Sequence, residues 1–182
     1  MQLRFVCSGA KLEMSNNPNY YRNILCHYPS NTTSLYEKQI EIDLPRTFPN
    51  DEYYSQTVIR KMKNILLAFS RRNISIGYCQ GFNFIVGRLL KLIPEEEEAF
   101  WTFTMMIETL LPQNYFINMV GVMIDCTLFT EMLKKTVPEL SDYIKENGFE
   151  VMFTNLIYKW FLSLFSQSIS ESVNYNLCSC VI

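Results

Sequence analysis

The sequence contains a single histidine, His27, and this scarcity narrows the chemistry open to the chain. Zinc sites and Ser-His or Cys-His nucleophiles use histidine as ligand or base, so one histidine excludes a histidine-rich metal centre and weakens the case for such a nucleophile. Cys26 beside His27 has neither metal-ligand spacing nor a second pair. A glycine-rich loop that would cradle phosphates is also missing. We therefore expect the chain to bind no metal and no cofactor of its own.

Long apolar runs are lacking as well. Residues 1–6 show no apolar stretch of the kind found in a signal peptide, and no run approaches the ~18 apolar residues of a membrane span. Asn155 and Lys159 interrupt the best candidate, and Ser179 stands where a prenylation box needs cysteine. These features predict a cytoplasmic protein without direct membrane insertion, with any recruitment to membranes through its partner.

Neither sign of charge is in large excess. The net charge of -2 and the pI of about 5.5 argue against nucleic acid as a partner, since phosphate binding needs a basic surface. The six cysteines are scattered, and we interpret them as reduced thiols packed in the core.

One stretch, 60–72, is locally basic. We interpret it as a solvated helix face; the alternative is an electrostatic guide toward an acidic protein surface or a nucleotide.

Helical periodicity is what the chain has in abundance. With 182 residues, of which 48% are hydrophobic, it is long and apolar enough for one globular domain with a sizeable core. Apolar residues recur at helical spacing and no segment alternates like a strand. The fold class is therefore predicted to be all-α. Helices are expected over about 51–72 with Asn50 as N-cap, from near Gln80 to Pro94, from there to before Pro112, and over about 118–136, 138–147 and 151–165.

Residues 40–47, Ile-Glu-Ile-Asp-Leu-Pro-Arg-Thr, form the first of two segments with chemical potential. Pro45 fixes its own φ and is expected to push Leu44 out of the helical region, so that Arg46 leaves the backbone in a restricted direction. Arginine stays charged and can bind two phosphate oxygens at once, which lysine cannot reproduce. A plain local salt bridge between Asp43 and Arg46 is the alternative. In the functional interpretation, Asp43 orients the guanidinium.

The second segment is Tyr-Cys-Gln-Gly at 78–81. Gly77 and Gly81 bracket it and predict a tight turn that holds Gln80 near the start of the next helix. A carboxamide accepts a hydrogen bond from water while donating one to a phosphate oxygen, so Gln80 could position a nucleophilic water. The alternative is an amide that caps a helix. Slow GTPases are accelerated by these same two groups, a glutamine that orients water and an arginine that neutralises charge on the phosphoryl group.

Both segments resemble the signature motifs of the TBC domain, the GTPase-activating fold for Rab proteins. The family's I-x-x-D-x-x-R and Y-x-Q-G motifs are matched by Ile40, Asp43 and Arg46 and by Tyr78, Gln80 and Gly81. The resemblance extends from about Arg4 to about Ser168 and implies a multi-helix, all-α fold. It implies that Arg46 and Gln80 are catalytic, as an arginine finger and a glutamine finger inserted in trans, and that Asp43, Tyr78 and Gly81 support them.

The resemblance also implies the partner, a Rab-type small GTPase in its GTP-bound form and a role in vesicle trafficking. GTP and magnesium would belong to that partner, and the chain would have no independent enzymatic activity. The glutamine finger would take the place of the Rab's own catalytic glutamine.

The C-terminal part departs from the family pattern. Family members continue beyond the helix containing Trp160 and Phe161 with a Trp-Asp segment and more helices, whereas Ser168 is followed here by Ile-Ser-Glu-Ser-Val-Asn. We expect a TBC-like domain over 1–168, partial at both ends and C-terminally shortened, and a divergent tail over 169–182. Apolar surface should then be uncovered where Trp160, Phe161 and Leu164 lose packing partners. The alternative function is a non-catalytic Rab-binding or scaffold module, inactive because of the shortened C-terminal part.

Overall fold

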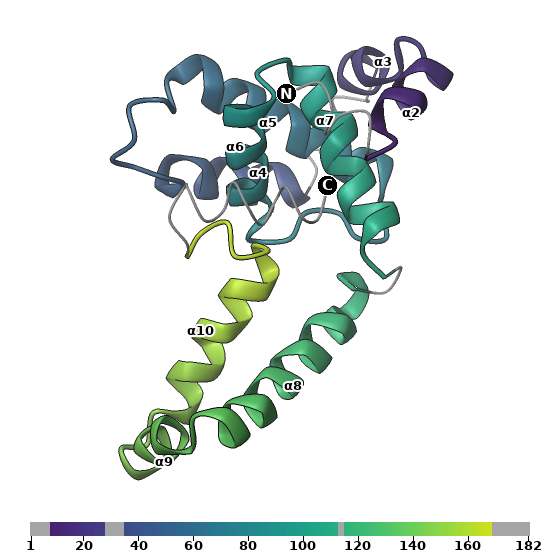
Figure 1. The fold of residues 1–182 in the computed structure, drawn as a ribbon. Helices are drawn as coiled ribbons and strands as arrows, with labels where there is room; N and C mark the ends of the chain where they lie inside the picture. The colour runs from purple at the N-terminus through teal and green to yellow at the C-terminus, as the bar shows by residue number, and fades with distance from the viewer. Residues whose placement is uncertain (1–7, 28–34, 113–114, 169–182) are drawn as a thin grey trace.

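The computed structural model describes residues 8–27, 35–112 and 115–168, and every regular element in these ranges is helical (Figure 1). The all-α prediction is confirmed, while the tail predicted over 169–182 lies outside the described residues. Short elements are the 3₁₀-helices η1 (Leu44–Arg46) and η3 (Ile117–Met119) and the π-helical η2 (Met106–Leu110). The α-helices are α2 (Ala10–Asn16), α3 (Tyr20–Cys26), α4 (Leu35–Asp43), α5 (Gln56–Arg72), α6 (Phe82–Leu92), α7 (Glu96–Met105), α8 (Val120–Thr136), α9 (Pro138–Glu146) and α10 (Glu150–Leu162).

Helices α5, α6 and α7 supply the centre of the core. Phe69 of α5, Phe82 of α6 and Phe103 of α7 meet edge to face, with ring centroids 4.9–5.8 Å apart. Aromatic pairs prefer this geometry, and it adds to the stabilisation from burial. All three side chains are fully buried. The first residue of α6 is therefore fixed in the core, and so is the end of the loop that precedes this helix.

Helix α5 begins at Gln56, so the predicted start at about Asp51 after Asn50 was wrong. The side chain of Asp51 explains the difference. Its carboxylate accepts the backbone N–H of Tyr53 at 3.0 Å and the ammonium of Lys91. Aspartate often replaces helical hydrogen bonds with local ones of this kind, and the resulting turn delays the helix.

One other boundary differs from the expected one. Helix α10 ends at Leu162 rather than at about Phe165, whereas α6 begins at Phe82, near the expected start at Gln80. Leu164 and Phe165 have φ of 46° and 62°, outside the helical region, so Leu164 does not lie on the apolar face of α10 as predicted. Helices α8 and α9 agree with the predicted ranges.

Helices α8, α9 and α10 form an arm (Figure 1): α8 leads away from the globular part, α9 lies at the far end and α10 returns. Phe129 of α8 contacts Trp160 and Phe161 of α10, with centroids 5.9 and 6.1 Å apart. Trp160, Phe161 and Leu164 are partly buried and pack against the core. The expectation that they lose packing partners relative to a longer domain stays a prediction. Exposed apolar side chains lie elsewhere on the arm: Val120, Met123, Ile124, Leu128, Met132, Val151 and Met152.

No helix within the described ranges is long and apolar enough to cross a membrane.

Candidate functional site

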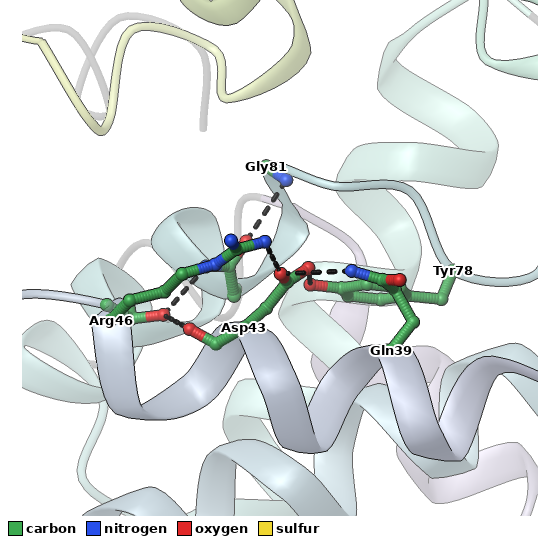
Figure 2. A network of polar contacts seen from close by, with 7 residues as sticks. Gln39, Asp43, Arg46, Tyr78 and Gly81 are labelled. Atoms are coloured by element: carbon green, nitrogen blue, oxygen red, sulfur yellow. Dashed lines mark hydrogen bonds and ion pairs between the residues drawn. The ribbon is translucent and has the colours of Figure 1, made fainter.

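The carboxylate of Asp43, at the end of α4, is the centre of a buried polar network (Figure 2). Its side chain is fully buried and accepts hydrogen bonds from Arg46 Nη2, from Gln39 Nε2 at 3.1 Å and from the Tyr78 hydroxyl at 2.7 Å. A buried charge is tolerated when it is paired and hydrogen-bonded in this way. Asp43 therefore fixes one side of the guanidinium, while 55% of the Arg46 side chain remains exposed.

The backbone that carries Arg46 is a single turn of 3₁₀-helix, η1, with Pro45 in its first turn. The prediction that Pro45 keeps Leu44 out of the helical region was wrong, because Leu44 is the first residue of that turn and is buried. Thr47 closes the turn: its N–H donates to the Leu44 carbonyl at 3.1 Å and its hydroxyl to the Asp43 carbonyl at 2.8 Å. Arg46 thus leaves a short, internally bonded turn in a restricted direction, as expected.

A second chain of hydrogen bonds ties this turn to the loop before α6. Asn83 Nδ2 donates to the Thr47 hydroxyl at 2.7 Å, and Asn83 Oδ1 accepts the Gly81 N–H at 3.0 Å. Asn83 is almost fully buried, so it holds both loops in one arrangement. Sequence analysis did not identify it. The available signal was a lone amide on the otherwise apolar first turn of α6.

Tyr78 and Cys79, which precede Gln80 in the loop, are both buried. Burial raises the pKa of the Tyr78 hydroxyl far above its ordinary value, and the Asp43 carboxylate raises it further, so the hydroxyl stays protonated and acts as a donor. Burial also raises the pKa of the Cys79 thiol to about 12, which leaves it without the thiolate that a nucleophile needs. Gln80 is therefore the exposed side chain of the segment 78–80 that precedes α6.

Gly81 allows the end of α10 to approach this loop closely. Its φ is +119°, which side chains rarely adopt, and a Cβ placed there would lie 2.7 Å from the carbonyl oxygen of Leu162. The segment after α10 is anchored as well. Arg88 Nε donates to the Ser166 carbonyl at 3.3 Å, and its guanidinium carbon lies 4.3 Å from the centroid of the Phe48 ring. The arm is thereby joined to the two loops.

An open cleft of about 240 Å³ lies where the turn that carries Arg46, the loop that carries Gln80 and the end of α10 meet. Arg46 and Gln80 both line it, so the structure brings the two predicted site residues to one place. Gly81 lines it too, whereas Asp43 and Tyr78 lie behind Arg46. The remaining lining residues, which sequence analysis did not single out, are Asn83, Phe84, Lys159, Leu162 and Gln167.

The basic stretch on α5 mostly serves the fold. Lys61 donates to the Pro94 carbonyl, Lys63 pairs with Glu41, and Arg71 donates to the Ile24 carbonyl. Arg72 pairs with Glu108. The interpretation of the stretch as a solvated helix face was wrong, because Lys61, Lys63, Arg71 and Arg72 are half-buried and bound within the molecule.

The model of the Rab-GTPase-TBC domain family matches residues 6–180. The chain belongs to this family. Among curated proteins, Growth hormone-regulated TBC protein 1-A of Danio rerio is 34% identical over 166 residues, covering 88% of this chain and 45% of that protein. TBC1 domain family member 2B of Mus musculus is 33% identical over 171 residues, covering 92% of this chain and 17% of that protein. This TBC chain thus spans less than half the length of these relatives.

Solved structures give the same result for the fold. The Chlamydomonas flagellar RabGAP TBC domain superposes with a TM-score of 0.77 at 28% identity, covering 96% of this chain and 57% of that one. The Ypt/Rab-GAP domain of Gyp1p has a TM-score of 0.73 at 17% identity, covering 94% and 63%. The second likeness supports the fold alone. The TBC fold predicted from the two motifs is confirmed.

Replacing Gly81 by alanine is expected to lower the free energy of unfolding by about 1–3 kcal/mol, because the new Cβ meets the Leu162 backbone and is held at a strained φ. Urea unfolding measures the change. Gly148→Ala is a matched control, since Gly148 has φ +67° but a Cβ there has no neighbour within 4 Å. Equal losses for both variants would show that the approach of Leu162 is unimportant.

Proposed function

We propose that this TBC chain is a GTPase-activating protein for a Rab-family GTPase, with Arg46 and Gln80 acting together in trans. The observation that carries the proposal is that both side chains line one open cleft, although they come from different loops. Phosphoryl transfer depends mainly on positioning and on neutralising charge, and an arginine and a carboxamide in one cleft can supply both.

The environment of Arg46 suits an arginine finger. A guanidinium has five N–H donors, and Asp43 engages one of its nitrogens from behind, so donors remain for the phosphate oxygens of a docked nucleotide. The contact with Asp43 also limits the conformational entropy that the side chain loses on binding. Asp43 and Tyr78 are positioning residues in this scheme because they act through Arg46.

The environment of Gln80 suits a water-orienting amide. Its side chain is exposed, while the neighbouring Gly81 N–H is bound to Asn83 and the loop is fixed against α10. Gln80 would take the role of the Rab's own glutamine. GTP and Mg²⁺ come with the partner, and the chain itself supplies no cofactor. Action on a Rab places the protein in the cytoplasm, in vesicle trafficking, with any membrane recruitment through that partner.

The test compares GTP hydrolysis by a panel of GTP-loaded Rab proteins with and without the full chain. Acceleration of at least one Rab supports the proposal. Binding to a Rab without acceleration would favour the alternative, a non-catalytic Rab-binding or scaffold module. Neither binding nor acceleration across the panel would overturn both.

A further inference from the structure

The cleft is positively charged although the chain as a whole is not. Its charged lining residues are Arg46 and Lys159, its carboxamides are Gln80, Asn83 and Gln167, and no acidic side chain is among the residues that line it. Arg46 is paired with the Asp43 carboxylate behind it, so the positive charge that stays unbalanced in the cleft, among the described residues, is that of Lys159. The net charge of the chain is -2, so this positive charge is local. A cleft lined by one sign of charge focuses the field and raises the rate at which an oppositely charged partner arrives.

Lys159 owes its place to the returning helix α10. Leu162, one turn later on the same face, also lines the cleft, and its carbonyl oxygen lies against Gly81. The hydroxyl of the buried Ser163 donates to the carbonyl of Lys159 at 2.8 Å. The backbone at Lys159 is therefore fixed against the loop that carries Gln80, while its long side chain stays exposed.

The ammonium of Lys159 has no ion-pair or hydrogen-bond partner within the part of the chain that the structure describes. Other lysines close to the core differ in this respect: Lys63 pairs with Glu41, and Lys91 pairs with Asp51. A lysine that is bound within the fold has little attraction left for a partner. Among the described residues, nothing competes for the Lys159 ammonium at the mouth of the cleft.

We propose that Lys159 binds an oxyanion of the docked GTP-bound GTPase and, where that oxyanion is an acidic side chain, helps to select the partner. This inference rests on the proposed function. The oxyanion is either an acidic side chain on the GTPase surface beside the nucleotide or a phosphate oxygen of the nucleotide. Lysine carries a compact charge on a flexible stem, so it contributes attraction and selection, whereas Arg46 provides the directed, planar contact.

The experiment measures GTP hydrolysis by a responsive Rab at several concentrations of the GTP-loaded protein, for wild type, Lys159→Ala and Lys159→Glu. An acidic contact on the GTPase surface predicts that KM rises roughly three- to tenfold in Lys159→Ala and more in Lys159→Glu, with kcat unchanged. The difference from wild type should shrink in high salt, because exposed charges are screened. Lys145→Ala is the matched control: Lys145 is exposed on α9, far from the cleft, and should have no effect (Figure 1).

The source of the oxyanion is read from the two kinetic constants. A rise in KM, reversed for Lys159→Glu by a carboxylate-to-lysine change on the GTPase, assigns the contact to the protein surface. A fall in kcat with unchanged KM assigns it to the nucleotide phosphates.

If wild type accelerates a Rab and both Lys159 variants match it, this inference is overturned and the proposed function stands. If wild type binds a Rab without accelerating it, the same variants are compared by Kd, and equal values overturn the inference. If wild type neither binds nor accelerates any Rab, both are overturned.

Discussion

Arg46→Lys is expected to lower the single-turnover rate of GTP hydrolysis by a responsive Rab roughly 10³- to 10⁵-fold, close to the Rab's intrinsic rate. This corresponds to about 4–7 kcal/mol of activation free energy. Lysine keeps the positive charge but loses the planar fork that spans two phosphate oxygens. Because Asp43 lies behind residue 46, a lysine ammonium that pairs with it has few donors left for the nucleotide.

The Arg46 experiment needs a test of folding, since Asp43 is buried and loses a donor when Arg46 is replaced. Gln39 and Tyr78 still donate to Asp43, so circular dichroism should show an intact helical fold in both Arg46→Lys and Arg46→Ala. Arg60→Lys serves as the matched control, because Arg60 is exposed on α5 outside the cleft. Near-normal activity of the Arg46→Lys variant would show that Arg46 is not an arginine finger.

The helices could be predicted where local signals agree, and their ends could not where side chains from elsewhere intervene. Pro138 opens α9 and Gly148 follows its end with φ +67°, so both boundaries are written in adjacent residues. The predicted start of α5 was wrong because Asp51 accepts a hydrogen bond from the Tyr53 N–H and pairs with Lys91, a residue of another helix. Periodicity within a segment carries no information about such a partner.

The same distinction applies to the site. Arg46 and Gln80 could be located from short motifs, in which Pro45 restricts the backbone beside Arg46 and Gly77 and Gly81 allow the tight turn around Gln80. Asn83 and Phe84 of α6 follow the second motif directly, whereas Lys159, Leu162 and Gln167 come from α10 and the segment after it, and the return of the α8–α10 arm brings them there. Nothing next to Lys159 in the sequence marks it as a cleft residue. Its position depends on the close approach of Leu162 to Gly81, a contact between distant parts of the chain.

Gln80→Ala is expected to reduce the activation of a responsive Rab by roughly 10²- to 10³-fold, the usual effect of losing one preorganised polar group at a reacting centre. The side chain is exposed and lines the cleft, so its removal should cost little stability. Single-turnover hydrolysis measures the rate and thermal unfolding measures the stability. Gln56→Ala is a suitable control, because Gln56 is an exposed glutamine at the start of α5.

A Rab whose own catalytic glutamine is replaced separates a glutamine finger from a merely supportive residue. If Gln80 orients the attacking water in trans, wild-type chain should still accelerate hydrolysis by that Rab variant, and Gln80→Ala should not. If the Rab's glutamine does this work, the Rab variant should resist activation even by the wild-type chain. That second result, obtained with a Rab whose unmodified form is activated, would refute the role assigned to Gln80 while leaving Arg46 as the chain's contribution to catalysis.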